Sequence, residues 1–414
     1  MSNAFNNPTI FAERSLQQLE NACVTGNLVF RGYEGEWRKS HNGYKPGQSI
    51  SLTCPVYFRA KSGAAVDVVD LVERSITMSL TNRWHVAWEL TSEEQTYNID
   101  SYSERFLKPA MEALANKIDI SIMNLYKYIP NQVGTPGVTP KDFLTFALAN
   151  SKLTEHATPQ DNRNVIINPD VQAYMLDHLK SVFNPGMTGP AIERAKLPPL
   201  ATMNAYVSNN VAMHTCGTSA GVAALAVDTP APAEGATGIT IDNGSGDWTT
   251  TLTEGDIFTI AGVFGVNPVT GASTGKLRQF VVRTAASDAG TESLVSCCPG
   301  VSPNQIYSAS ATEAYLPYQN VVSLPAENDV VTVAGSTGLV HPVNMAFHRD
   351  ALALAMVELN MPQTAVWGKT MNHKGFSIRV YKYLDGGNDK EIIRFDALWA
   401  VSAINPFMGT RLAG

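Results

Sequence analysis

One segment of the sequence differs in character from the residues on either side of it. Residues 229–340 are poor in helix-favouring runs and rich in Thr, Val, Ser, Gly and Ala, with short apolar runs at 256–260 and 279–282 between Gly, Pro and Asn turns. The flanking sequence mixes helix and strand patterns. The simplest architecture is therefore an α+β body of 129–228 and 341–414, interrupted by an inserted all-β, barrel-like domain.

The N-terminal part predicts elements that reach beyond this body. Residues 1–27 carry one short apolar stripe, which predicts an arm that needs a partner surface. Residues 28–100 alternate with period two, which predicts an extended hairpin at about 28–60 followed by more strands. Two strands alone are barely stable in water, so we expect the arm and the hairpin to find no cover on their own chain and to lie on a second subunit. The candidate subunit-contact residues are Arg31, Glu34, Glu36, Arg38, Lys39, Lys45, Arg59 and Lys61.

Residues 101–128 carry the clearest helix pattern in the chain. The apolar residues recur every three or four positions, which places them on one stripe of a long helix. They are Leu107, Met111, Leu114, Ile118, Ile122 and Leu125. Pro109 lies inside the predicted helix and predicts a kink near its start.

The sequence from His341 onward returns to a mixed pattern. Asn344 can cap a helix that continues through Phe347 to Leu359, and residues 376–380 and 392–403 predict strands. Together these elements complete the interrupted body.

Three local patterns suggest chemistry, and each is weak. Residues 217–221 match a nucleophile elbow around Ser219, but that motif needs a strand before the serine and a helix after it. His214 with Cys216 is half of a metal site without a second pair at ligand spacing. Residues 242–247 resemble a calcium loop in composition but lack the closing Glu. We therefore predict no enzyme, no catalytic residue, no cofactor and no metal ion, and we expect the five cysteines to be reduced thiols.

The charge pattern limits the possible partners. Charged residues make up 16% of the chain, against about a quarter in an average soluble domain. The net charge is −7, and residues 229–340 alone hold ten acidic and three basic side chains. Nucleic-acid binding depends on clustered Lys and Arg, so an acidic chain of this kind is not expected to bind DNA sequence-specifically. No run approaches the roughly 20 apolar residues of a membrane span, and no membrane partner is expected.

The order of these elements resembles the tailed-phage major capsid fold, and in particular the coat proteins of Salmonella-type short-tailed bacteriophages that carry an insertion domain. The run Val-Ile-Ile-Asn-Pro-Asp within 164–170 is similar to that family's strand–helix junction. Residues 255–263 and 279–282 look like the core strands of its insertion domain, and 344–351 resemble the helix where the chain re-enters the body. The likeness covers nearly the full length.

The resemblance implies a role for each part. The hairpin is the extended loop on a neighbouring subunit, 101–128 is the spine helix, and 229–340 stabilises the subunit and decorates the shell. It also implies hexamers and pentamers of the chain in a shell around double-stranded DNA, with scaffolding and portal proteins during assembly in the bacterial cytoplasm. The family's scaffold contact lies near the N-terminal arm, where Glu13 and Glu20 are the acidic candidates. The family's bridging loop corresponds to a short stretch at 241–248, so that bridge is expected to be lost or moved.

Two classes of function remain open from the sequence. The first is a shell-forming capsid subunit. The second is a receptor- or carbohydrate-binding surface protein whose acidic β module is the binding head. Deleting 229–340 is expected to leave a soluble but less stable body under the first hypothesis.

Overall fold

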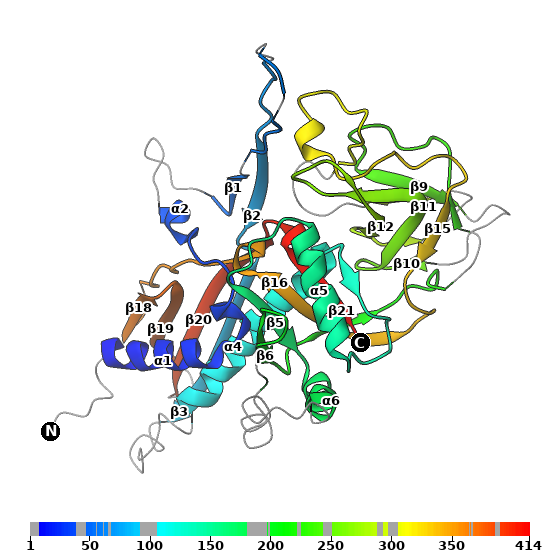
Figure 1. Cartoon of the computed structure of the whole chain (residues 1–414). Coiled ribbons are helices and arrows are strands. Elements are labelled where there is room, and N and C mark those ends of the chain that lie inside the picture. Colours follow the sequence, from blue (N-terminus) through cyan, green and yellow to red (C-terminus); the bar gives the residue numbers. More distant parts are fainter. Residues whose placement is uncertain are drawn as a thin grey trace. The chain divides into compact units, whose positions relative to one another are not determined.

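The structure is a computed structural model of the chain (Figure 1). Contacts divide it into two compact units, which we describe one at a time. Unit 1 contains Met1–Ser51, Thr77–Ile122 and Ala353–Ser402, and unit 2 contains Leu52–Ile76, Met123–Leu352 and Ala403–Gly414. The residues that the structure describes are 8–38, 47–54, 56–60, 62–64, 68–91, 106–179, 197, 199–221, 225–242, 251–287, 293–296, 305–363, 365, 367–385 and 390–414.

A five-stranded sheet forms the core of unit 1. Its strands are β3 (Asn82–Thr91), β17 (Leu352–Met356), β18 (Trp367–His373), β19 (Phe376–Asp385) and β20 (Lys390–Ala403). The order is β17-β20-β19-β18, and β3 also pairs with β20. The strands predicted at 376–380 and 392–403 are confirmed, because β19 and β20 cover them. Their inward side chains, such as Phe376, Phe395 and Trp399, are fully buried.

The N-terminal segment is a helix that packs on this sheet. α1 (Pro8–Ala22) lies against β18 and β19, and η2 (Thr25–Asn27) follows it. The side chains that α1 buries are Ala12, Leu16 and Leu19. The expectation that the arm finds no cover on its own chain is therefore wrong for residues 8–27, since the apolar stripe of α1 meets an apolar sheet face of the same unit.

The predicted long helix consists of α4 (Lys108–Met123) and a final turn η4 (Asn124–Tyr128). Every residue of the predicted apolar stripe is buried: Leu107, Met111, Leu114, Ile118, Ile122 and Leu125. Pro109 lies near the start of α4, which directly follows residues 106 and 107, and these two residues form a π-helical turn. The predicted kink near the start of the helix stays a prediction. Residues 101–105 lie outside the described part of the chain.

One buried carboxylate on α4 holds the N-terminal segment through hydrogen bonds. Asp119 accepts hydrogen bonds from the backbone N–H of Val24 at 2.9 Å and of Gly26 at 3.0 Å. Burial raises the pKa of Asp119, although these N–H donors act in the opposite direction. The contact fixes the chain after α1 as well as the helix itself.

A second sheet forms the body of unit 2. Its strands are β4 (Gln132–Val133), β5 (Arg163–Ile167), β6 (Asn204–Val207), β7 (Ala212–Thr215), β16 (Val340–His348) and β21 (Gly409–Ala413). β16 pairs with β5, β7 and β21 and so lies at the centre. The helices α5 (Phe143–Glu155) and α6 (Pro169–Leu179) pack on it through a shared apolar cluster. The predicted strand–helix junction is confirmed, since Asn168 Oδ1 accepts from the N–H of Val171 at 2.9 Å.

The helix predicted from Asn344 to Leu359 is wrong, and the resemblance of 344–351 to a helix of re-entry fails with it. These residues form β16, the turn η6 (Arg349–Ala351) and β17. The Asn344 side chain bridges strands, accepting from Asn168 N at 2.8 Å and donating to Leu412 O at 3.3 Å. A strand buried on both faces is apolar at most positions, and periodicity alone cannot separate it from a buried helix.

The inserted domain is all-β. Its strands are β8 (Leu225–Val227), β9 (Gly238–Asp242), β10 (Thr251–Leu252), β11 (Ile257–Val266), β12 (Ser273–Val281), β13 (Ala286–Ser287), β14 (Ser293–Ser296) and β15 (Val330–Val333). Six of them form one sheet in the order β12-β11-β15-β8-β9-β14, over an apolar core of its own (Figure 1). β8 belongs to this sheet although it precedes residue 229, so the insertion begins earlier than the sequence predicted.

The extended hairpin is not at 28–60. β1 (Ser49–Cys54) pairs with β2 (Arg74–Ser79), and residues 55–73 connect them. Upstream, α2 (Glu34–Arg38) is a helix, and residues 39–46 lie outside the described part. The two strands can pair because each buries every second residue, so that the apolar residues of both strands lie on the same face of the pair. The buried residues are Ile50, Leu52 and Cys54 in β1 and Ile76 and Met78 in β2.

The cysteines in the described part of the chain form no disulfide. Cys23, Cys54 and Cys216 are buried free thiols. Cys297 and Cys298 lie outside the described residues. None of the helices that the structure describes combines the length and the apolar character needed to cross a membrane.

Candidate assembly site

Among the charged residues predicted to contact a second subunit, those that the structure describes do not lie together on a hairpin. Three belong to the short helix α2: Glu34, Glu36 and Arg38. Arg31 precedes α2, and its guanidinium lies 4.5 Å from the ring centre of Phe376 in unit 1. Lys39, Lys45, Lys61 and the side chain of Arg38 lie outside the described residues.

Arg59 lies in the connection between β1 and β2 and contacts the inserted domain of its own chain. It donates to Gln319 Oε1 at 3.1 Å. Nearby, the guanidinium of Arg74 lies 4.9 Å from the ring centre of Tyr57 and 4.3 Å from that of Tyr318, which belongs to η5 (Leu316–Tyr318). The expectation that the extended hairpin has no cover on its own chain is therefore wrong for the part of the β1–β2 connection that holds Arg59.

The same connection also holds three exposed apolar side chains, which we call the ribbon tip. Phe58 is 78% exposed, Val68 87% and Leu71 57%. Large apolar side chains gathered on a surface segment mark an interaction site more often than scattered ones do. None of these three residues is among the subunit-contact candidates predicted from the sequence, all of which are charged.

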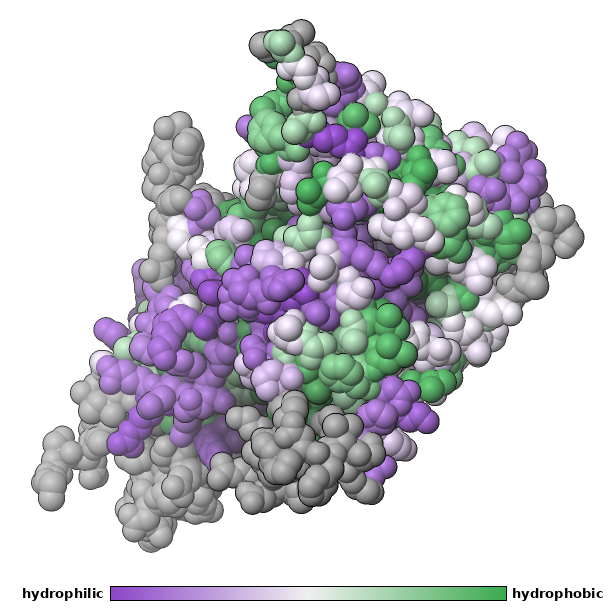
Figure 2. All heavy atoms as spheres, in the orientation of Figure 1, coloured by the Kyte–Doolittle hydropathy of each residue, from purple (hydrophilic) through white to green (hydrophobic). Residues whose placement is uncertain are grey.

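A second exposed apolar surface lies on α5. Phe143, Leu144 and Leu148 are exposed there, while Phe146 and Leu153 on the opposite face are buried. Figure 2 shows apolar side chains gathering on the side of the molecule that carries this helix. A helix that is apolar all round is normally covered on both faces.

The two acidic residues predicted to meet a scaffolding protein have different surroundings. Glu20 accepts a hydrogen bond from Lys374 Nζ at 2.7 Å, and this contact lowers the pKa of the carboxyl group. His373 Nε2 lies 3.8 Å from the same carboxylate. Glu13 is exposed on α1. A scaffold contact at Glu13 stays a prediction, and one at Glu20 has to compete with Lys374.

A buried polar cluster lies where the chain leaves the body for the inserted domain and returns. His214 on β7 and His341 on β16 are cross-strand partners, and their rings meet edge to face at 5.5 Å. His214 Nε2 lies 2.9 Å from Asp256 Oδ1, and its Nδ1 lies 3.0 Å from the hydroxyl of Tyr126. Cys216 Sγ lies 3.8 Å from His341 Nδ1. We call His214, Cys216, Asp256 and His341 the insertion root.

Cationic side chains beside the insertion root join the inserted domain to the body. Arg411 of β21 donates from Nη1 to Gly255 O at 2.6 Å, and burial lowers the pKa of its guanidinium to about 9. Glu254 accepts from Lys127 Nζ at 3.1 Å, and Arg283 donates to the backbone O of Lys127 at 2.9 Å. The attachment is thus polar and specific, with Arg411 buried and the Lys127–Glu254 pair partly exposed.

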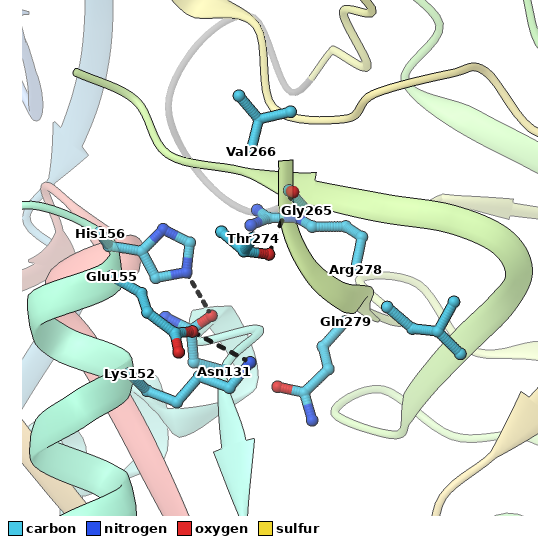
Figure 3. A pocket seen from close by; sticks show the side chains of 10 residues that line it. Asn131, Lys152, Glu155, His156, Gly265, Val266, Thr274, Arg278 and Gln279 are labelled. Carbon is cyan, nitrogen blue, oxygen red and sulfur yellow. Dashed lines mark hydrogen bonds and ion pairs between the residues drawn. The ribbon is translucent and has the colours of Figure 1, made fainter. Parts of the chain in front are cut away.

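A small pocket lies between α5 and the β11–β12 hairpin. Figure 3 shows Lys152, Glu155 and His156 on the α5 side, with Thr274 and Arg278 opposite them. His156 Nε2 lies 3.0 Å from Asn131 Oδ1, and its ring stacks on Phe407 with centres 5.5 Å apart. Because the Asn131 amide nitrogen donates to two backbone carbonyls, Oδ1 is the acceptor and His156 Nε2 carries the proton.

The half-buried His156 should make the fold sensitive to acid. Burial, Arg278 and Lys152 lower the pKa of His156 well below its usual 6.5. The folded chain then binds fewer protons than the unfolded chain below that pH, so stability falls as the pH falls through 6.5. We expect urea unfolding of a His156→Gln variant to lose less stability than the parent between about pH 7 and about pH 5.

Four charged side chains lie close to His156 and contribute to its electrostatic surroundings. Lys152, Arg278 and Lys276 are cationic, and Glu155 is the carboxylate between them. The control is His85→Gln, which replaces an exposed histidine on β3. Equal pH slopes for the parent and the His156→Gln variant would contradict the assignment.

The serine motif at 217–221 lacks the context of a nucleophile elbow. Ser219 is fully buried, and its N–H donates to Thr251 O at 3.1 Å. A turn follows β7 here, and β8 begins at Leu225. The described residues therefore run from strand to turn to strand, and the helix that the motif requires has no room.

Comparison with known proteins connects this fold to a family. A family model described as "P22 coat protein - gene protein 5" matches residues 9–414. The chain belongs to the P22 coat protein family. With this membership, the fold is the tailed-phage capsid fold that the sequence predicted, including its mixed α and β class.

Individual relatives of this coat protein family member are distant. The major capsid protein of Acyrthosiphon pisum secondary endosymbiont phage 1 is 31% identical over 100 residues, which span 23% of this chain and 23% of that protein. The chain therefore matches less than a quarter of the length of that curated relative.

The solved structures that resemble the chain carry phage and coat-protein titles. Mycobacterium phage Che8 matches at a TM-score of 0.48 and 11% identity over 94% of this chain and 90% of that one. The capsid of Ralstonia phage GP4 matches at 0.45 and 6% over 94% and 87%. The CUS-3 coat protein I-domain is 26% identical, with a TM-score of 0.19, over 27% of this chain and 96% of that one.

Proposed function

We propose that this chain is a major capsid protein that assembles with copies of itself into an icosahedral shell around a phage genome. Its membership of the P22 coat protein family supports the role. The exposed ribbon tip is the observation that carries the proposal, because more than half of the surface of each of these three apolar side chains is exposed among the described residues. A neighbouring subunit covers them in a shell.

The energetics favour apolar contacts over ion pairs for this task. Burying one Val, Leu or Phe side chain fully contributes about 1.5–3 kcal/mol, whereas an exposed ion pair contributes about 0–1 kcal/mol. The tip offers three such side chains, Phe58, Val68 and Leu71. The exposed face of α5 adds a second apolar contact, and repetition around every subunit multiplies both.

The remaining roles follow from this proposal. Residues 1–27 with 28–100 supply the peripheral elements, 101–128 is the spine helix, and the inserted domain from β8 to β15 is the stabilising insertion. Scaffolding and portal proteins are the proposed assembly partners in the host cytoplasm, with Glu13 as a scaffold contact. The chain encloses double-stranded DNA without reading its sequence, has a structural role and no enzymatic one, and ends in the virion capsid.

Charge substitutions at the ribbon tip test the proposal. We expect the triple variant Phe58→Asp, Val68→Asp and Leu71→Asp to stay folded but to form no shells, because the apolar contacts between subunits are replaced by repelling carboxylates. Folding is spared since these side chains are exposed. Negative-stain microscopy and sedimentation velocity measure shells against free subunits.

The control places a single added carboxylate at a polar position of the same connection. Ser62→Asp alters an exposed residue in the same connection and should leave assembly unchanged. Shells at normal yield from the triple variant would overturn the role of the tip. Discrete monomers or trimers of the parent chain at every concentration would count against the capsid function itself.

A further inference from the structure

The insertion root brings metal-binding side chains from distant parts of the chain to one buried place. His214 and Cys216 come from the strand that leaves the body, and Asp256 comes from the start of β11. One ligand atom from each lies within 4.8 Å of the others, and all three residues are buried. His341 on β16 lies beside this group, with its Nδ1 3.8 Å from Cys216 Sγ, and is not one of the three residues whose ligand atoms lie mutually within 4.8 Å.

We propose that His214, Cys216 and Asp256 form a binding site for one divalent zinc-like cation. A thiolate, an imidazole and a carboxylate are donors that Zn²⁺ accepts. The closest of these ligand atoms, His214 Nε2 and Asp256 Oδ1, already lie 2.9 Å apart.

The surroundings already orient the ligands. Oδ2 of Asp256 accepts from the N–H of Gly217 at 3.1 Å, from the N–H of Thr253 at 2.7 Å and from its hydroxyl at 3.0 Å, which leaves Oδ1 toward His214. The Tyr126 hydroxyl lies beside His214 Nδ1, so Nε2 is the nitrogen presented to the ion. Hydrogen bonds of this kind hold metal ligands in place and fix the histidine tautomer.

Two glycines make the close approach possible. A side chain at Gly335 would come within 2.8 Å of Cys216 Sγ, and one at Gly255 within 3.2 Å of the His214 ring. Both residues have positive φ values, +101° and +105°, which other residues rarely adopt. The backbone therefore surrounds the ligands without filling the space between them.

Proton and charge balance are consistent with binding. Cys216 has a pKa raised by burial to about 11, so the ion displaces the thiol proton, and one proton is released to solvent for each ion bound. When the ion occupies Nε2 of His214, the ring proton lies on Nδ1, and Nδ1–H donates a hydrogen bond to the hydroxyl oxygen of Tyr126. A dication with one thiolate and one carboxylate is neutral, so the nearby guanidinium of Arg411 meets no net like charge.

The site would join the strands on both sides of the insertion to the inserted domain. An ion that binds the folded chain and not the unfolded one stabilises the fold. This inference goes beyond the proposed capsid function and does not depend on it.

Cobalt titration of the full-length chain tests the site. In chelator-treated, reduced protein we expect one Co²⁺ per chain to give a thiolate-to-cobalt charge-transfer band and the visible bands of a tetrahedral ion, with ZnCl₂ abolishing both. ZnCl₂ should also raise the melting temperature. The Cys216→Ser variant should lose the charge-transfer band and the rise in melting temperature.

The control variants locate the thiolate. Cys23→Ser and the double variant Cys297→Ser/Cys298→Ser should keep the full cobalt spectrum. If Cys216→Ser does not fold, protection of Cys216 in the parent chain from alkylation by ZnCl₂, read by mass spectrometry, replaces it. No thiolate band in the parent chain, a band that survives Cys216→Ser, or no protection of Cys216 would each overturn the proposal, while shell assembly would stand unaffected.

Discussion

We expect a chain in which a short Gly-Ser linker replaces residues 217–338 to lose several kcal/mol of body stability. The ends can be joined, because the N–H of Cys216 donates to Leu339 O at 2.9 Å. The deletion removes the partners of His214, Arg411 and Lys127 and uncovers the buried ring of Tyr126. Hydrogen bonds to charged groups contribute about 1.5–3 kcal/mol each. Each kcal/mol of lost stability lowers the melting temperature of a domain of about 150–250 residues by roughly 2–4 °C.

The complementary fragment provides the control for this deletion. The inserted domain has an apolar core of its own, built from residues between Cys216 and Val333. Residues 217–338 expressed alone should therefore unfold cooperatively, while the body without them melts at least roughly 10 °C lower than the full chain. Calorimetry measures both. A body fragment as stable as the full chain would show that the polar contacts at the insertion root contribute little.

The second large effect is expected at Asp396 in unit 1. This carboxylate is fully buried on β20, accepts from Arg394 Nε at 2.7 Å, and pairs with Arg379 across the sheet. Replacing it with alanine leaves the buried guanidinium of Arg379 without its counter-charge. Breaking a buried pair in this way costs about 3–5 kcal/mol, which urea unfolding at neutral pH measures.

Two further variants separate charge from packing at this site. Glu112→Ala removes an exposed carboxylate from α4 and should change stability by less than about 0.5 kcal/mol. Adding Arg379→Met to Asp396→Ala should recover part of the loss, because no unpaired buried cation remains. A double variant that is less stable than Asp396→Ala would show that the packing of Arg379, and not its charge, decides the effect.

Sequence patterns identified the long helix well and the strands between 340 and 356 poorly. The stripe from Leu107 to Leu125 repeats over enough turns for helix to be the only periodic solution. The run around Asn344 is short and apolar at most positions, so its i, i+4 spacing suggested a helix where a central strand lies. Only pairing with β5, β7 and β21 distinguishes the two.

The hairpin shows a similar limit. The alternation of Ile50, Leu52 and Cys54 correctly gave a strand, but nothing local states which other strand it pairs with. The sequence predicts a hairpin within about 28–60, whereas the chain pairs β1 with β2 across a connection that reaches to residue 73. Pairing partners are chosen by matching buried faces, which is a non-local property.

By itself the sequence determined the interrupted body, the buried stripe of the long helix, the strand–helix junction at Asn168 and the family resemblance, because each depends on order and local periodicity. Tertiary structure alone decided the partner of β1, the docking of α1, the exposure of Phe58 and the meeting of His214 and Cys216 with Asp256 and His341. Those residues are far apart along the chain, and no spacing rule joins them. Their proximity results from the pairing of β7 with β16 and the attachment of the inserted domain, which only folding in three dimensions creates.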